Sequence, residues 1–140
     1  MYQKISAAVT GVIVLMLLAA GAVAFTDEQA EQGKDLYGQY CAVCHGPDAR
    51  GGNVPQQFGK VAGKNVPPLA GPGALQGMEN AFQVYEFAKT RMPPGHPGML
   101  EDQQYLAIIA FALQANGLQS KGQPLTPDSA KQIGLPVGKK

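Results

Sequence analysis

The 140-residue sequence has few charged residues and no excess of either sign. Only 15% of the residues are charged, and 11 basic against 10 acidic side chains leave a formal net charge of +1. Lysine and arginine are not gathered into the patches or runs that nucleic-acid-binding chains show. The composition therefore gives no reason to expect a nucleic-acid partner.

Cysteine and histidine are also scarce, which excludes several kinds of site. The chain has two cysteines and two histidines, and three of these four residues lie within residues 41–45, Cys-Ala-Val-Cys-His. A closed structural zinc site needs four ligands, and His96 is the one further candidate. A disulfide between neighbours on one helical turn is geometrically poor. A dithiol redox site requires a βαβ context and no obligatory histidine.

The spacing within residues 41–45 instead favours covalent haem attachment. On a helix, Cys41 lies three residues from Cys44 and four from His45, so the three side chains share one face. Two thiols on that face suit thioether links to the vinyl groups of a haem, while the imidazole reaches the iron. Because Cys-x-x-Cys-His is the attachment pattern of c-type haem, the sequence predicts one covalent haem c with its iron here.

The N-terminus has the pattern of an export signal. An apolar run over residues 12–20 precedes Ala22 and Ala24, the small-x-small pattern that signal peptidase recognises. We expect residues 1–24 to be a signal peptide that is cleaved after Ala24. The alternative is a membrane anchor, because residues 7–25 carry no charge and are just long enough to span a bilayer. Both place the remaining chain on the periplasmic side of the bacterial cytoplasmic membrane, soluble or tethered.

A helix is predicted to lead into the cysteine motif. Thr26 and Gln29 fit a capping box, with Thr26 as N-cap and the Gln29 side chain bonding back to it. Gly33 lies inside this helix at a cost of about 1 kcal/mol relative to Ala. Either a second helix contacts the chain at Gly33 or the glycine is merely tolerated, and the local pattern leaves both open.

Two more helices follow a long loop. Residues 46–77 are rich in glycine and proline, and wrapping around a cofactor would justify so long a loop. A helix over residues 79–90 must stop before Met92, because the proline pair at 93–94 cannot continue a helix. The next helix covers residues 101–116, and its segment 105–113 is apolar on nearly every side, so burial on more than one face is expected. The polar tail has a short helix start at Thr126, and its Ile133 and Leu135 can pack back on the domain.

The other axial side of the iron has four candidate ligands. They are Met78, Met92, His96 and Met99. We favour Met92, because it follows a helix end and precedes two prolines that stiffen the backbone and pre-position a thioether. His/Met ligation suits electron transfer, whereas an open side suits ligand binding or oxygen chemistry.

These motifs, in this order, resemble class I c-type cytochromes. Within that class, the chain resembles small bacterial monohaem cytochromes c and the cytochrome c subunits of dehydrogenase or oxidase complexes. The resemblance covers about residues 26–117, and it implies an all-α cytochrome c fold of three to four helices with long loops around one haem. Residues 26–117 would be the cytochrome c domain, and residues 118–140 a C-terminal extension.

The resemblance also implies roles for single residues. It implies thioethers from Cys41 and Cys44, with His45 as proximal and Met92 as distal iron ligand. The carbonyl of Pro67 or Pro68 would accept the Nδ1–H of His45. Leu69 would pack on the haem plane. The first and last helices would cross with Gly33 and Tyr37 against Ile108 and Phe111.

Two departures from the family pattern concern the haem edge and the docking surface. Tryptophan is absent, so an aromatic contact to the haem edge must come from a residue such as Phe58 or Tyr85. A ring of lysines is also missing, which favours an apolar docking face or a permanent complex.

The expected function is electron transfer between periplasmic or membrane-bound redox partners. A dehydrogenase, an oxidase or another cytochrome would be such a partner, and the chain itself would be a carrier rather than an enzyme, with a membrane tether as a further possibility. The alternative is a haem c enzyme or gas-binding sensor with an open distal site.

Overall fold

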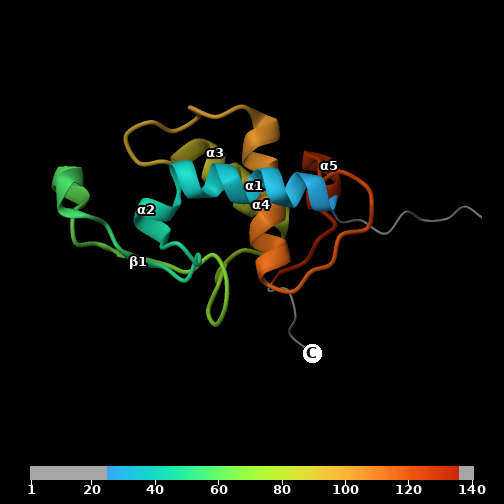
Figure 1. Ribbon diagram of the computed structural model, residues 1–140, viewed down its shortest axis with the longest axis horizontal. Helices are drawn as coiled ribbons and strands as arrows, with labels where there is room; N and C mark the ends of the chain where they lie inside the picture. Colours follow the sequence, from blue (N-terminus) through green and yellow to red (C-terminus); the bar gives the residue numbers. More distant parts are fainter. Residues whose placement is uncertain (1–24, 136–140) are drawn as a thin grey trace, which may run out of the picture.

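The computed structural model describes residues 25–135 and has an all-α architecture within that range (Figure 1). The elements follow the order α1 (Asp27–Tyr40), α2 (Ala42–His45), β1 (Gly52–Asn53), the 3₁₀ helix η1 (Gln56–Val61), β2 (Asn65–Val66), α3 (Ala81–Arg91), α4 (Asp102–Ala115) and α5 (Pro127–Ala130). The predicted signal peptide or anchor, residues 1–24, lies outside the described residues.

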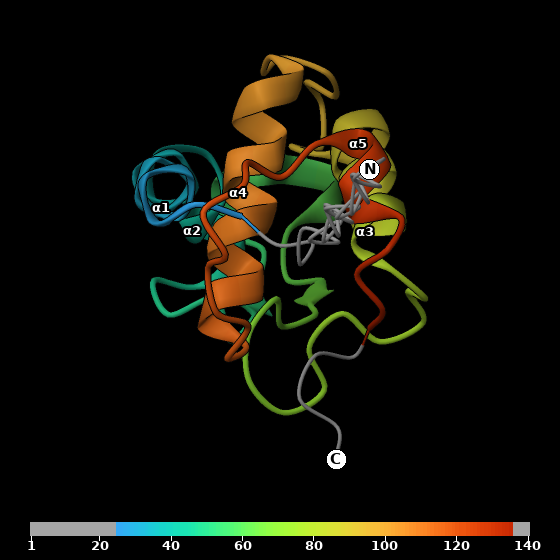
Figure 2. The same cartoon turned by 90° about the vertical axis from the view of Figure 1, so that its right-hand side faces the viewer.

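Helices α1 and α4 cross at Gly33. Figure 1 shows α1 lying across α4, and Figure 2 shows α1 end-on beside it. A Cβ atom on Gly33 would stand 1.8 Å from the carbonyl oxygen of Ala107 and 2.9 Å from the nitrogen of Ile108. The rings of Tyr37 and Phe111 pack with centroids 5.1 Å apart at the same crossing. Gly33 is therefore the point at which a second helix contacts α1, and it is not merely a tolerated glycine.

Helix α4 forms the centre of the hydrophobic core. Its buried residues are Tyr105, Leu106, Ala107, Ile108, Ile109, Ala110, Ala112 and Leu113. Burial on more than one face is thereby confirmed for residues 105–113. The helix starts at a capping box between Glu101 and Gln104, and Gly117 follows its end with φ +90°, a left-handed conformation that glycine adopts easily.

Helix α3 has the predicted end. Asn80 is its N-cap, and the Asn80 side chain accepts a hydrogen bond from the Gln83 nitrogen at 3.0 Å. Met92 is its C-cap, directly before the proline pair. The predicted stop before Met92 is confirmed.

The predicted capping box of α1 is only half correct. Thr26 Oγ1 accepts a hydrogen bond from the Gln29 nitrogen at 3.0 Å, as expected for an N-cap. The Gln29 side chain, however, donates to the Leu125 carbonyl at 3.0 Å and accepts from the Leu125 nitrogen at 2.7 Å. Because Leu125 offers two partners at once, the amide turns away from the Thr26 nitrogen.

Residues 118–135, here called the C-terminal strap, pack on the helical core. Leu125 and Ala130 are fully buried and Ile133 nearly so. The Lys121 nitrogen donates to the carbonyl of Phe25 at 3.0 Å. Figure 2 shows α5 of the strap beside α3, where the Ala81 nitrogen donates to the Ile133 carbonyl at 2.9 Å. The predicted short helix after Thr126 and the packing of Ile133 are confirmed.

The loop over residues 46–77 is mostly irregular, as predicted. It also contains η1 and a short antiparallel pairing of β1 with β2, with Gly52 opposite Val66 and Asn53 opposite Asn65. Strands of two residues are too short to leave an alternating pattern in the sequence. Among residues 25–135, none of the helices has the length and apolar character needed to span a membrane.

Candidate functional site

Helix α2 carries the cysteine motif on a turn separate from α1. Cys41 ends α1, with its nitrogen donating to the Tyr37 carbonyl at 2.9 Å, and it also precedes α2. The Cys41 carbonyl accepts from the nitrogens of Cys44 at 3.1 Å and His45 at 2.9 Å. The two cysteines and His45 therefore share one tight turn at the end of α1 (Figure 1).

The imidazole of His45 is oriented by a backbone carbonyl. Its Nδ1 lies 3.2 Å from the oxygen of Pro67. A carbonyl can only accept a hydrogen bond, so Nδ1 carries the proton and the lone pair is on Nε2. In this tautomer Nε2 can bind a metal while Nδ1 donates to the Pro67 carbonyl.

Gly51 allows the Pro67 loop to approach the motif. Its nitrogen donates to the His45 carbonyl at 2.9 Å. A Cβ atom at position 51 would lie 2.4 Å from the Val66 oxygen, and φ there is +83°. The close approach and the left-handed backbone both require glycine at this position.

Burial shifts the pKa values of two residues of the motif, His45 and Cys41. It lowers the pKa of His45, against the opposing effect of the Pro67 hydrogen bond, so the neutral imidazole that binds metals is favoured. Burial, followed by the charge of Cys44, raises the pKa of Cys41 to about 11. Both cysteines are free and half-buried.

Leu69 is held in place by a residue that sequence reasoning missed. Asn116, the C-cap of α4, donates from Nδ2 to the Leu69 carbonyl at 2.7 Å. Its Oδ1 accepts from the Gly71 nitrogen at 3.2 Å. In the sequence, Asn116 has only the signal of a helix end.

The candidate distal ligands differ in exposure. Met92 and Met78 are half-buried, whereas His96 is exposed and Met99 is 52% exposed. The Met92 carbonyl accepts a hydrogen bond from the hydroxyl of Tyr105 at 2.8 Å, a second contact that the sequence did not reveal.

Of the two aromatic candidates for the haem edge, Phe58 is 40% exposed and Tyr85 only 2%.

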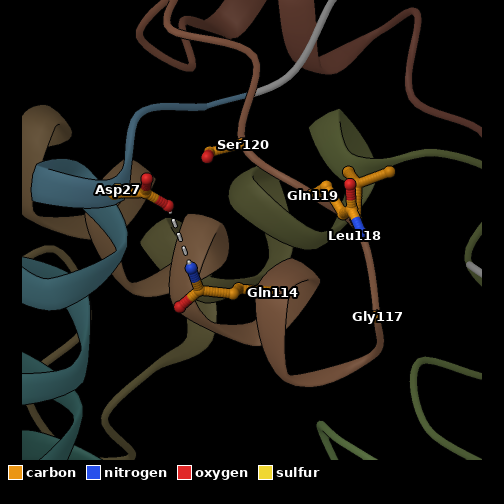
Figure 3. Close-up of a pocket in the computed structure, with 6 residues that line it drawn as sticks. All are labelled: Asp27, Gln114, Gly117, Leu118, Gln119 and Ser120. Carbon is orange, nitrogen blue, oxygen red and sulfur yellow. Dashed lines mark hydrogen bonds between the residues drawn. The ribbon is translucent and has the colours of Figure 1, made fainter.

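A polar depression elsewhere on the molecule is separate from these residues. It is lined by Asp27, Gln114, Gly117, Leu118, Gln119 and Ser120 (Figure 3). The Gln114 side chain donates to Asp27 across it at 3.4 Å. None of the candidate haem residues lines it. Within residues 25–135, His, Cys, Asp and Glu side chains form no group of three or more that would hold a metal ion.

The donor set fits a covalently bound haem. Two free thiols and a histidine share one turn, and the Pro67 carbonyl accepts from the histidine Nδ1, which leaves Nε2 to bind the iron. Together with the α1–α4 crossing, these features define a c-type cytochrome. Residues 28–111 match the family described as cytochrome c oxidase, cbb3-type, subunit III, and the chain belongs to that family.

Known proteins that are similar to the chain include two thiosulfate dehydrogenases and one solved structure. A thiosulfate dehydrogenase of Stutzerimonas stutzeri (strain A1501) is 35% identical over 83 residues, which are 57% of this chain and 25% of the relative. A thiosulfate dehydrogenase of Psychrobacter arcticus is 28% identical over 88 residues, 61% of this chain and 25% of the relative. The chain thus spans about a quarter of the length of these relatives.

The third is a solved structure, the crystal structure of the sulfane dehydrogenase SoxCD from Paracoccus pantotrophus. It superposes with a TM-score of 0.58 at 26% identity, covering 81% of this chain and 61% of that chain. The predicted all-α cytochrome c fold, the covalent haem c with its iron and the electron-transfer function are confirmed. The domain class also indicates an extracellular or periplasmic location.

Proposed function

We propose that the chain transfers single electrons through a haem c held by Cys41 and Cys44, with His45 and Met92 as axial ligands. The observation that carries the proposal is the 3.2 Å contact between His45 Nδ1 and the Pro67 oxygen. That hydrogen bond fixes the ring and makes Nε2 more basic. When bound, the haem supplies the one-electron redox couple, and the protein supplies ligands, burial and orientation.

Met92 is the proposed distal ligand because its backbone is held on both sides. Its nitrogen donates to the Ala88 carbonyl at 2.8 Å, and its carbonyl accepts from Tyr105. With its backbone fixed in this way, the Met92 thioether would hold the distal side of the iron closed. Met99 lies in the next part of the same loop and is 52% exposed, which makes it a matched control.

The ligand assignment is tested by absorption spectra of the ferric protein. The thioether-to-iron charge-transfer band should disappear in Met92→Ala and survive in Met99→Ala. Its survival in Met92→Ala would refute the assignment. Attachment is tested by the mass of the purified chain, since Cys41→Ala combined with Cys44→Ala should lose the haem mass.

The open-site alternative makes the opposite prediction. An enzyme or gas sensor with a free distal position should bind carbon monoxide readily in the ferrous state at neutral pH. A closed His45/Met92 shell should not, until Met92 is replaced by alanine. Ready binding by the wild-type protein would favour the alternative.

We propose a dehydrogenase-type protein as the electron donor. The two curated relatives are named thiosulfate dehydrogenases, and the structural relative is a sulfane dehydrogenase. The nearly neutral chain lacks a strong charge for steering partners, which favours a lasting complex over brief encounters. Copurification with such a subunit, and haem reduction by thiosulfate in the complex but not in the isolated chain, would support this. Reduction of the isolated chain at the same rate would contradict it.

The N-terminal segment is proposed to be a signal peptide, with residues 1–24 removed and residues 26–117 forming the cytochrome c domain ahead of the 118–140 extension. A membrane tether through residues 7–25 is the competing proposal. The intact mass of the chain from its native cell distinguishes them, because cleavage after Ala24 removes a defined mass and the covalent haem adds one.

A further inference from the structure

The hydroxyl of Tyr105 joins the two ends of the loop that contains the proposed distal ligand. Tyr105 is in the first turns of α4 and is only 2% exposed. Its hydroxyl donates to the Met92 carbonyl at 2.8 Å and accepts from the Gly98 nitrogen at 3.1 Å. One buried oxygen thus closes the segment 92–98, which runs between α3 and α4.

We propose that Tyr105 is a positioning residue that holds Met92 in place as the distal ligand. This inference rests on the proposed function, in which Met92 binds the iron. A phenol can donate and accept at the same time, so it satisfies the backbone at both ends of the loop. Phenylalanine would keep the ring and leave both backbone groups without this partner.

The composition of α4 sets the hydroxyl of Tyr105 apart. Residues 106–113 carry only apolar side chains, as a helix buried on several sides requires. Tyr105 is the exception at the start of this segment, and its polar atom lies against the Met92 loop. Burial of the ring explains an aromatic residue at this position, but only the two loop contacts use the hydroxyl.

The packing of α3 on α4 has a support that does not involve this hydroxyl. Lys89 Nζ lies 2.8 Å from Asp102 Oδ1, which links the end of α3 to the start of α4. The apolar contacts of the Tyr105 ring also remain in Tyr105→Phe. Loss of the hydroxyl should therefore loosen residues 92–98 while the two helices stay in place.

The test compares Tyr105→Phe with Tyr37→Phe in the haem-loaded protein. Tyr37 is also 2% exposed, and its hydroxyl donates to the carbonyl of Gly46 beside the proximal histidine. The measured quantity is the affinity of the ferric protein for cyanide, which must displace the distal thioether. We expect a rise of about tenfold in Tyr105→Phe, the equivalent of about 1.4 kcal/mol and the size of one net hydrogen bond. In Tyr37→Phe the change should stay within about twofold.

Each outcome decides the proposal. A lower unfolding midpoint in Tyr105→Phe with unchanged cyanide affinity would show a merely structural role and overturn it. Met92→Ala separates this failure from failure of the proposed function. If Met92→Ala binds cyanide no more tightly than wild type, Met92 is not the ligand; if it binds more tightly while Tyr105→Phe does not, only the Tyr105 role fails.

A second measurement uses the wild-type protein alone and does not depend on a variant that folds. Gly98 is exposed, so its amide should exchange with solvent quickly unless the Tyr105 hydroxyl accepts from it. We expect its hydrogen exchange to be at least about tenfold slower than that of Gly95 in the same loop, because exchange requires the hydrogen bond to open. Equal exchange at the two glycines would overturn the proposal.

Discussion

A methyl group at position 33 should separate α1 from α4. In Gly33→Ala, the new Cβ would lie 1.8 Å from the Ala107 oxygen, 2.3 Å from the Ala107 carbonyl carbon and 2.9 Å from the Ile108 nitrogen. All three are backbone atoms of a buried helix, so none can rotate away. Ordinary contact begins at 3.4 Å, and α1 would have to retreat by about 1.6 Å to reach that distance from the oxygen.

Two opposing terms set the size of the effect. Alanine is favoured over glycine inside a helix by up to about 1 kcal/mol. Overpacking a close-packed contact costs about 1–3 kcal/mol or more, and here the retreat also weakens the Tyr37–Phe111 packing at 5.1 Å. An approach of 1.8 Å to fixed backbone atoms places the overpacking cost at the upper end of that range, about 3 kcal/mol, so we expect a net loss of about 2 kcal/mol. In a domain of this size, that lowers Tm by roughly 8 °C.

Thermal unfolding of the haem-loaded protein, followed by far-ultraviolet circular dichroism, measures this loss. Gly38→Ala is the matched control, because Gly38 lies in the same helix and a Cβ there meets nothing within 4 Å. That variant should be more stable by about 0.5–1 kcal/mol. If Gly33→Ala is as stable as Gly38→Ala, the close crossing of α1 and α4 is not present in solution and the reasoning fails.

Three further predictions concern polar contacts. Asn116→Ala removes the partner of the Leu69 carbonyl and of the Gly71 nitrogen. The free energy of unfolding, measured in urea, should fall by about 1–3 kcal/mol. An unchanged urea midpoint would contradict this prediction. Gln29→Ala frees both backbone groups of Leu125 and should speed proteolysis within the strap, with Gln29→Glu, which keeps only the acceptor, intermediate. The hydrogen bond from Lys89 lowers the pKa of Asp102 in the folded protein. The ion pair therefore stabilises the fold above the unfolded Asp pKa of about 3.9, and this stabilisation is lost as pH falls through the lowered pKa of the folded state. The Tm of Asp102→Asn should therefore fall less steeply with acid than that of wild type, and equal slopes would argue against the pair.

Helix boundaries were predictable because their signals are local. The proline pair after Met92 ends α3 whatever the rest of the chain does, and Gly117 follows α4 in the expected left-handed conformation. The apolar segment 105–113 also required burial on several sides, and the fold provides it. The Cys-x-x-Cys-His pattern is equally local and specific, so the kind of cofactor followed from five residues.

The missed contacts join residues that are far apart in the sequence. Gln29 bonds to Leu125, 96 residues away, and Asn116 bonds to Leu69, 47 residues away. Nothing near Gln29 distinguishes a capping role from a distant backbone partner. The Tyr105 hydroxyl is a similar case, because an apolar helix accounts for the ring and leaves the oxygen without a predicted partner. The role of Gly33 could not be predicted from its own helix, because it depends on contact with Ala107 and Ile108 of α4.

Helix α4 and its C-cap take part in three of these contacts, those of Tyr105, Asn116 and Gly33. Near its start, Tyr105 bonds to the loop of the proposed distal ligand, and at its end Asn116 bonds to the loop just after Pro67. Between them, Ala107 packs directly on α1, which leads into the cysteine turn. One buried helix therefore contacts the loop of the proposed distal ligand, the loop just after Pro67 and the helix that leads into the cysteine turn. Electron transfer is fastest when the ligands move little between oxidation states, and a shared rigid support limits their movement. Substitution of Tyr105 or Asn116 should consequently affect one side of the haem, whereas substitution of Gly33 should destabilise the whole fold.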